Sequence, residues 1–236
     1  MKPENIFQEI KRIAYTNGAK LIGIADLKKI DIDDFLINKD VLQKFTCAIS
    51  IAVPLLRGIF QEIIDHPTLL YFHHYRQINN LLDRIALEIA QYIENTDKNF
   101  LAMPIPASQI VDWQTQRGHL SHKRIAVQAG LGWLGRNNLL VTKEYGAQVR
   151  LTTILTNIEF PLSVFLKSIP FSCGECEKCL KGCPASAINT NPDEFDHFKC
   201  FEKLKEFQRK GYTHQYICGI CVKVCGPQFS NSATGI

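Results

Sequence analysis

The chain has 236 residues, of which 46% are hydrophobic and 21% charged, and a formal net charge of +4 at pH 7. A chain of this length buries roughly 70–75% of the surface that its unfolded form exposes, so it does not need disulfides to fold. Its composition is that of a globular protein, which excludes a disordered chain. No apolar run reaches the ~18 residues of a membrane span and no apolar signal core follows the N-terminus, so we expect a cytoplasmic protein without a membrane partner, in which cysteines stay reduced or bind metal.

Two helices and three strands are expected in the first hundred residues. Apolar residues at three- and four-residue steps predict helices over 3–17 and 67–94. Short runs rich in β-branched and small residues predict strands over 19–26, 46–54 and 99–106.

The next fifty residues contain a third expected helix and a strand pair. The helix covers 122–129 and is ended by Gly130. Two apolar runs, 138–142 and 147–156, flank a turn and predict an antiparallel hairpin.

Composition changes near residue 160, where regular strand patterns stop and cysteines and prolines accumulate. We therefore expect an α/β or α+β fold class with two domains. An N-terminal domain of mixed sheet and helix over 1–160 would hold a cofactor or substrate. A ferredoxin-like domain would follow over 161–236.

Eight cysteines form two runs. The segment "CGECEKCLKGCP" has the spacing of a bacterial two-cluster ferredoxin, in which the fourth cysteine ligates the other cluster. Structural zinc prefers paired Cys-x2-Cys units separated by a longer gap, so zinc is the weaker alternative. The ninth cysteine, Cys47, lies in an apolar strand and is expected in the core. We predict two [4Fe–4S] clusters, the first held by Cys173, Cys176, Cys179 and Cys225 and the second by Cys183, Cys200, Cys218 and Cys221.

The stretch "AGLGWLGRNN" contains Gly130, Gly132 and Gly135 in the spacing of a dinucleotide-binding turn. The nucleotide motif follows a strand, opens a helix and has an acidic residue about 20 positions later. Here an expected helix ends at Gly130, and no Asp or Glu stands at or next to position 155. We interpret the stretch as a helix stop followed by a compact glycine turn.

This glycine stretch and the sequence up to residue 156, followed by the two cysteine runs, resemble the epoxyqueuosine reductase family. The family consists of cobalamin-dependent iron–sulfur reductases related to the reductive dehalogenases. The resemblance implies an α/β domain that seats a corrinoid with its cobalt facing the nearer cluster. We expect an external donor of the ferredoxin or flavodoxin class to supply the electrons.

The resemblance also implies which residues line the cofactor pocket. "GWLGRN" is similar to the family's Gly-Trp-x-Gly-Lys-Asn block, with Arg136 in place of the usual Lys. "HHYRQ" is similar to a family helix that begins Asp-Tyr-His, with Tyr75 kept and Arg76 at the His position. The implied cofactor-binding residues are Tyr75, Arg76, Gly132, Trp133, Gly135, Arg136 and Asn137.

Two departures from the family bear on the substrate. The tRNA-acting members carry a C-terminal helical-repeat extension, whereas this chain ends about ten residues after Cys225, so we expect a short relative without it. Those members also place an acidic proton donor shortly before the glycine block. That position is Gln116 here, whose amide cannot act as a general acid, and Asp112 is out of register. Both departures favour a substrate other than epoxyqueuosine in tRNA.

Three functions stay open. The first is a reductase that passes electrons through the clusters to a corrinoid or a substrate in the N-terminal domain. The second is epoxyqueuosine reductase acting on tRNA, although Trp113, Arg117 and His119 offer few contacts for an RNA loop, and Lys and Arg are dispersed. The third is an electron carrier that docks to a redox partner, with an α/β domain that acts as a docking module or binds a flavin.

Four histidines before the cysteine runs are candidates for proton donors or cobalt ligands. His73 and His74 are adjacent, so they point to different parts of a helix surface and cannot both face one site well. His119 and His122 belong to the polar loop and to the start of the following helix. Tyr71, on the same expected helix as His73, is assigned to packing.

Overall fold

The computed structural model describes residues 1–166 and 172–227, which form helices and antiparallel strands and confirm the predicted fold class. None of the described helices is long and apolar enough to cross a bilayer. The α-helices are α1 (Pro3–Thr16), α2 (Lys39–Leu42), α3 (Leu69–Thr96), α4 (His122–Gln128), α5 (Lys178–Gly182), α6 (His197–Arg209) and α7 (Ile220–Val224). Short 3-10 helices are η1 (Leu27–Lys29), η2 (Arg57–Glu62), η3 (Leu162–Val164) and η4 (Pro192–Glu194).

The main sheet has the strand order β1-β2-β6-β3, and the two remaining strands of the described residues, β4 and β5, pair with each other. β1 is antiparallel to β2, and β3 is antiparallel to β6. The strands are β1 (Leu21–Asp26), β2 (Cys47–Pro54), β3 (Ala102–Ile105), β4 (Trp133–Leu134), β5 (Leu140–Val141) and β6 (Val149–Thr156).

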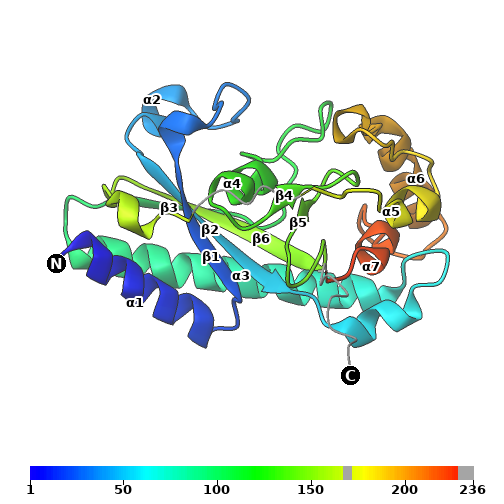
Figure 1. Cartoon of the computed structure of the whole chain (residues 1–236), viewed down its shortest axis with the longest axis horizontal. Coiled ribbons are helices and arrows are strands. Elements are labelled where there is room, and N and C mark those ends of the chain that lie inside the picture. The colour runs from blue at the N-terminus through cyan, green and yellow to red at the C-terminus, as the bar shows by residue number, and fades with distance from the viewer. Residues whose placement is uncertain (167–171, 228–236) are drawn as a thin grey trace. The chain divides into compact units, whose positions relative to one another are not determined.

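One face of the β1–β2 pair carries large apolar side chains. Ile22 and Ile24 on β1 belong to the same buried cluster as Ile49 and Ile51 on β2. The cluster also contains the buried residues of α1 and those of α3 from Leu82 to Ile93, and the two helices run side by side along this face (Figure 1). Strand side chains alternate between faces, so these large side chains all lie on one face of the strand pair. Together with the two helices on that face they form the main core.

The opposite face of the same strands carries small side chains. Gly23 stands opposite Ser50, and Ala25 stands opposite Ala48. A methyl group on Gly23 would lie 2.3 Å from the carbonyl oxygen of Ala129, the residue after α4. The absence of large side chains here lets the end of α4 approach the sheet closely.

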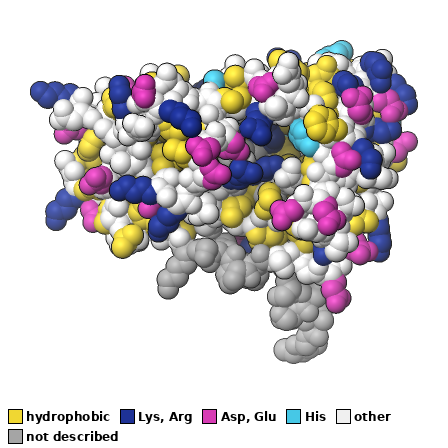
Figure 2. All heavy atoms as spheres, turned by 90° about the horizontal axis from the view of Figure 1, so that it is seen from above, with side chains coloured by type: hydrophobic (Ala, Val, Ile, Leu, Met, Phe, Trp, Pro, Cys, Tyr) yellow, Lys and Arg dark blue, Asp and Glu magenta, His cyan; other side chains and the backbone are white. Residues whose placement is uncertain are grey.

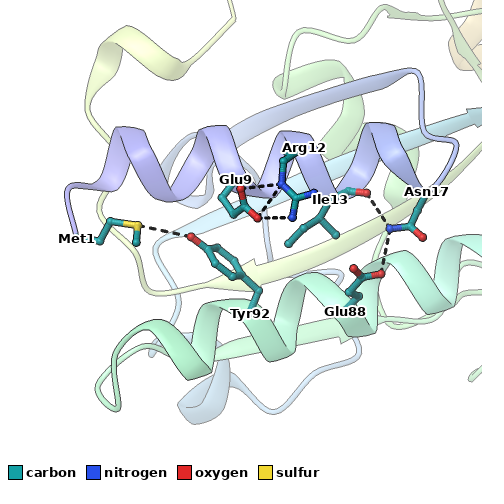
Figure 3. A network of polar contacts seen from close by, with 7 residues as sticks. All are labelled: Met1, Glu9, Arg12, Ile13, Asn17, Glu88 and Tyr92. Atoms are coloured by element: carbon teal, nitrogen blue, oxygen red, sulfur yellow. Dashed lines mark hydrogen bonds and ion pairs between the residues drawn. The ribbon is translucent and has the colours of Figure 1, made fainter.

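The packing of α1 on α3 is completed by polar contacts at both ends (Figure 3). Asn17 donates its side-chain amide to the Ile13 carbonyl at 2.9 Å and to the Glu88 carboxylate at 3.0 Å. The hydroxyl of Tyr92 lies 3.6 Å from the sulfur of Met1. The amide of Asn17 thus caps α1 and links it to α3.

The predicted hairpin of 138–142 with 147–156 is wrong. β5 pairs instead with β4, through Trp133 opposite Val141 and Leu134 opposite Leu140. β6 pairs with β3 in the main sheet. The apolar runs identified the strands, but the pairing of strands depends on segments that are distant in the chain. The intervening turn is closed by a bridge between Thr142 and Gly146, and the Tyr145 amide also donates to the Thr142 hydroxyl at 3.1 Å.

The chain divides into two compact units, which do not follow a boundary at residue 160. The second unit includes two segments from the predicted N-terminal domain. One of them packs on the second cysteine run, where the Ala147 amide donates to the Cys225 carbonyl at 2.9 Å. The first unit comprises Met1–Pro54, Tyr75–Leu131 and Arg150–Pro170, and the second comprises Leu55–His74, Gly132–Val149 and Phe171–Ile236.

Candidate iron–sulfur site

The eight cysteines of the two runs lie in the second unit, and none of them forms a disulfide bond. One group gathers around Cys225. Burial, followed by the neighbouring thiols of Cys179, Cys173 and Cys176, raises the pKa of Cys225 to about 11. Burial, followed by Cys173 and Cys176, also raises the pKa of Cys179. These four thiols therefore share one electrostatic environment, and they are the four that the spacing assigned to the first cluster.

The second group gathers around Cys221, whose pKa is raised well above its ordinary value, first by burial and then by the thiols of Cys218, Cys200, Cys183 and, last, Cys179. Burial raises the pKa of Cys218 to about 12, with smaller contributions from Cys200 and Cys183. The second predicted set thus also lies together. Cys179 is the link between the groups, since α5 packs against α7.

The first group opens on a pocket whose walls come from the glycine stretch and the cysteine runs. The ring of Trp133 packs with Val141 and Ala147, and Cys173 and Cys225 lie against this small cluster. Lys178, which no sequence motif indicated, adds a cation beside Cys179. The pocket is lined by Trp133, Arg136, Asn137, Val141, Cys173, Cys176, Lys178, Cys179, Val224 and Cys225.

The donor set of this pocket fits an iron–sulfur cluster. Four thiols meet at one largely apolar pocket, and two cations stand beside them. In the part of the chain that the structure describes, no three His, Cys, Asp or Glu side chains are grouped so as to hold a single metal ion. A [4Fe–4S] cluster binds each of its four cysteines at a different iron, so its ligands lie farther apart than those of one ion.

Arg136 holds the loop that carries the first cysteines. Its guanidinium donates to the carbonyl of Thr190 at 2.7 Å, to that of Gly174 at 2.7 Å and to that of Cys176. Three backbone acceptors therefore engage the side chain that the resemblance assigned to a cofactor. Arginine suits this role because its planar fork presents several donors in fixed directions.

The glycine stretch owes its spacing to close packing. Gly130 ends α4 with φ +76°, a conformation that favours glycine. A methyl group on Gly132 would lie 2.1 Å from the Val141 carbonyl oxygen, and one on Gly135 would lie 2.5 Å from the Val141 side chain. The stretch follows a helix and leads into β4, which agrees with the expected helix stop and turn.

Tyr75 and Arg76 belong to the first unit, unlike the other five residues of the implied cofactor pocket. The hydroxyl of Tyr75 lies 2.9 Å from the Ser108 hydroxyl and accepts from Arg150 at 3.1 Å. The Arg150 guanidinium also stacks over the Tyr75 ring at 4.4 Å and donates to Asn79 at 3.0 Å. Sequence spacing had no signal for Arg150, which is 75 residues from Tyr75 along the chain. Arg76 is exposed.

The candidate histidines divide as expected from their positions. His73 is exposed, whereas His74 is buried and its Nε2 accepts from the Leu56 amide at 3.1 Å. Burial, followed by the charge of His73, lowers the pKa of His74. His119 lies 3.2 Å from the Gln109 side-chain oxygen. The buried ring of Tyr71 fits against Gly219, as the packing assignment predicted.

His122 is held as a neutral ring between two partners. Its Nε2 lies 2.9 Å from the Pro106 carbonyl, which can only accept, so Nε2 carries the proton. Its Nδ1 then accepts from the Thr153 hydroxyl at 2.8 Å. Loss of hydration on burial, together with the nearby charge of Arg150, lowers the pKa of His122 to about 4. A neutral, fully bonded ring has a structural role in the first unit.

Because the folded ring of His122 resists protonation, the protein should become less stable as the pH is lowered. Below the ordinary pKa of 6.5, the unfolded chain binds a proton that the folded ring refuses until about pH 4. Between about pH 7 and about pH 5, this single group should cost about 2 kcal/mol of unfolding free energy. Anaerobic urea titrations should show that loss in the wild type, and His122→Gln should lack it. An exposed control, His73→Gln, should keep the wild-type pH dependence; equal slopes in all three proteins would contradict the assignment.

Comparisons with known proteins agree with the site. Residues 172–228 match the family described as a 4Fe-4S double cluster binding domain. The epoxyqueuosine reductase of Bacillus subtilis strain 168 is 34% identical over 116 residues, which are 46% of this chain and 29% of that protein. The chain is thus an iron–sulfur protein similar to epoxyqueuosine reductases, as the resemblance predicted, and it spans less than a third of the length of that relative.

Solved structures show the same fold. The epoxyqueuosine reductase of Streptococcus thermophilus has a TM-score of 0.65 at 23% identity, covering 94% of this chain and 65% of that one. A catabolic reductive dehalogenase in complex with 3-bromo-4-hydroxybenzoic acid has a TM-score of 0.69 at 16% identity, covering 95% of this chain and 32% of that one. At these identities the likeness concerns the fold.

Proposed function

We propose that the chain is an iron–sulfur oxidoreductase that passes electrons through two [4Fe–4S] clusters to an acceptor bound by its N-terminal domain. The observation that carries the proposal is the grouping of the eight thiols. Cys173, Cys176, Cys179 and Cys225 would hold one cluster, and Cys183, Cys200, Cys218 and Cys221 would hold the other.

The bound clusters would supply one-electron transfer, and the chain would supply their environment. Trp133 and Val141 exclude water from one side of the first set, and Arg136 keeps the cysteine loop in place. An external donor of the ferredoxin or flavodoxin class would deliver the electrons. The packing of α5, which carries Cys179, against α7, which carries Cys221, supports transfer between the two sets.

The acceptor that we propose is a corrinoid. This part rests on the fold likeness to a reductive dehalogenase whose structure is described with a mechanism for B12-dependent dehalogenation. Two of the predicted corrinoid contacts do not fit that role, because Tyr75 engages Ser108 and Arg150, and Arg136 engages three carbonyls. Neither side chain is therefore proposed as a corrinoid contact.

Epoxyqueuosine reductase acting on tRNA is the second candidate. The curated relatives carry that name, and one solved epoxyqueuosine reductase is described with an epoxyqueuosine-modified tRNA stem loop. On the face drawn in Figure 2, basic and acidic side chains are interspersed, without a broad basic track.

The loop before α4 gives a reason to favour a different substrate. A solved relative is described with a catalytic aspartate loop. Here Gln116 takes the position of the family's acid, with φ +55°. Asp112 accepts from the amide of Gln114 and from the hydroxyl of Thr115, and these bonds lower its pKa. Asp112 is thus committed to its own turn and is a poor proton donor.

Anaerobic purification with simultaneous assay of iron, sulfide, cobalamin and flavin tests the proposal. We expect about eight irons per chain, tight binding of added cobalamin, and a change in the cobalt spectrum when the clusters are reduced. Eight irons without cobalamin binding would remove the corrinoid, and bound flavin would favour the electron-carrier alternative. The absence of iron would overturn the whole proposal. Conversion of an epoxyqueuosine-modified stem loop to queuosine would establish the second candidate.

A further inference from the structure

The side chain of Asn137 lies in the pocket of the first cysteine set and is only 3% exposed. Its Oδ1 accepts from the backbone amide of Leu139 at 3.3 Å. This contact orients the side chain, because an amide nitrogen in the same place would face another donor. The side-chain oxygen of Asn137 is therefore used within the turn after β4, as the acceptor for the Leu139 amide.

The other end of this amide, Nδ2, is fully buried and has no hydrogen-bond acceptor among the described residues. A buried donor without an acceptor costs about 1–3 kcal/mol, so native proteins rarely keep one without a reason. The pocket walls around it hold the sulfurs of Cys173, Cys176, Cys179 and Cys225. Thiolates and the sulfides of a cluster are acceptors, and a loaded cluster would place them in this pocket.

The second cysteine set contains a contact of this type. The backbone amide of Ala187 lies 3.4 Å from the sulfur of Cys183 and donates to it. In the first set, Asn137 offers a side-chain donor instead. Arg136, its neighbour, contributes charge, but its donors are directed at the carbonyls of Gly174, Cys176 and Thr190.

We propose that Asn137 donates an N–H···S hydrogen bond to the cluster held by the first set and raises its reduction potential. The inference rests on the proposed function, because it requires that cluster. A donor beside sulfur stabilises the more negative, reduced state more than the oxidised state, and such bonds are among the factors that set cluster potentials. Asn137 is a positioning and tuning residue rather than a catalytic one.

The test is an EPR-monitored redox titration, with dithionite as the one-electron reductant. Asn137→Ala removes the donor without adding charge. Asn137→Asp also removes it but keeps an oxygen for the Leu139 amide. In both variants the reduced-to-oxidised ratio of the first cluster should fall about tenfold at a given ambient potential, a shift of about 59 mV for one electron. The second cluster is the internal control and should keep its potential.

Asn138→Asp is the matched control, since it adds the same charge one residue away at φ +58°, a conformation that Asp tolerates. It should shift the first cluster less than Asn137→Asp does. Equal shifts in these two variants, or an unchanged potential in Asn137→Ala, would overturn the inference. If these proteins still contain about eight irons per chain, the proposed function would stand. Loss of all iron from the wild type would instead remove the proposed function.

A measurement on the wild type needs no variant to fold. Protein labelled with ¹⁵N only in the side-chain amides of asparagine should show a weak nitrogen coupling to the reduced first cluster in pulsed EPR. No coupling in a protein with both clusters present would contradict the hydrogen bond directly.

Discussion

Replacing Cys179 with alanine should reduce the iron content of anaerobically purified protein from about eight to about four atoms per chain. Cys179 lies on α5 and shares its electrostatic environment with Cys173 and Cys176. Loss of one thiolate should release the whole first cluster, because a cubane held by three cysteines has an open iron corner. The EPR signal of the other cluster should remain.

Double variants test the grouping itself. Cys179→Ala combined with Cys225→Ala should lose no more iron than either single variant, because both cysteines are assigned to one cluster. Cys179→Ala combined with Cys221→Ala should lose nearly all iron. The reverse pattern would show that the two sets are assigned wrongly.

Cys47→Ala is the thiol control for these experiments. Cys47 is buried on β2 in the first unit and belongs to the main core cluster. Its replacement should leave the iron content unchanged and affect only packing. Loss of iron in this variant would mean that the assay reports general instability rather than ligand loss.

Replacing Gly132 with alanine should destabilise the second unit by roughly 1–3 kcal/mol or more, the usual cost of overpacking. The added methyl would lie 2.1 Å from the Val141 carbonyl oxygen, which is backbone and cannot rotate away. Separation of β4 from β5 would also displace Trp133 and Val141 from the first cysteine set. We therefore expect a lower urea midpoint together with loss of about four irons.

Gly58→Ala is the matched control for this substitution. Gly58 lies in η2 of the same unit, and a methyl group there would meet nothing within 4 Å. Its replacement should change the unfolding free energy by no more than about 0.5 kcal/mol and keep the iron. Equal behaviour of the two variants in urea and in the iron assay would contradict the close-packing role of Gly132.

Much of the fold was predictable because it depends on neighbours in the chain. The apolar positions of α1 and α3 recur at helical spacing, and both helices were expected from that spacing. The partners of the strands were not predictable in the same way. The segment of β5 has the apolar run of a strand next to a turn, yet it pairs with β4 rather than β6.

The candidate site was likewise predictable in part: the residues that line it could be identified, but the contacts of their side chains could not. The resemblance placed Trp133, Arg136 and Asn137 in a cofactor pocket, and the structure places all three around the first cysteine set. It does not direct Arg136 at a cofactor, because three carbonyls of the folded cysteine loop take up its guanidinium. Whether a long side chain faces a ligand or a backbone depends on acceptors that only folding brings near.

Residue types at short, regular separations were enough to predict the grouping of the cysteines, the long helices α1 and α3, and the helix stop and turn of the glycine stretch. The tertiary structure alone decided that Ala147 reaches Cys225, that Arg150 binds Tyr75, and that the amide of Asn137 is buried beside four thiols. These contacts join segments far apart in the chain, and their geometry is set by packing, which local periodicity does not encode.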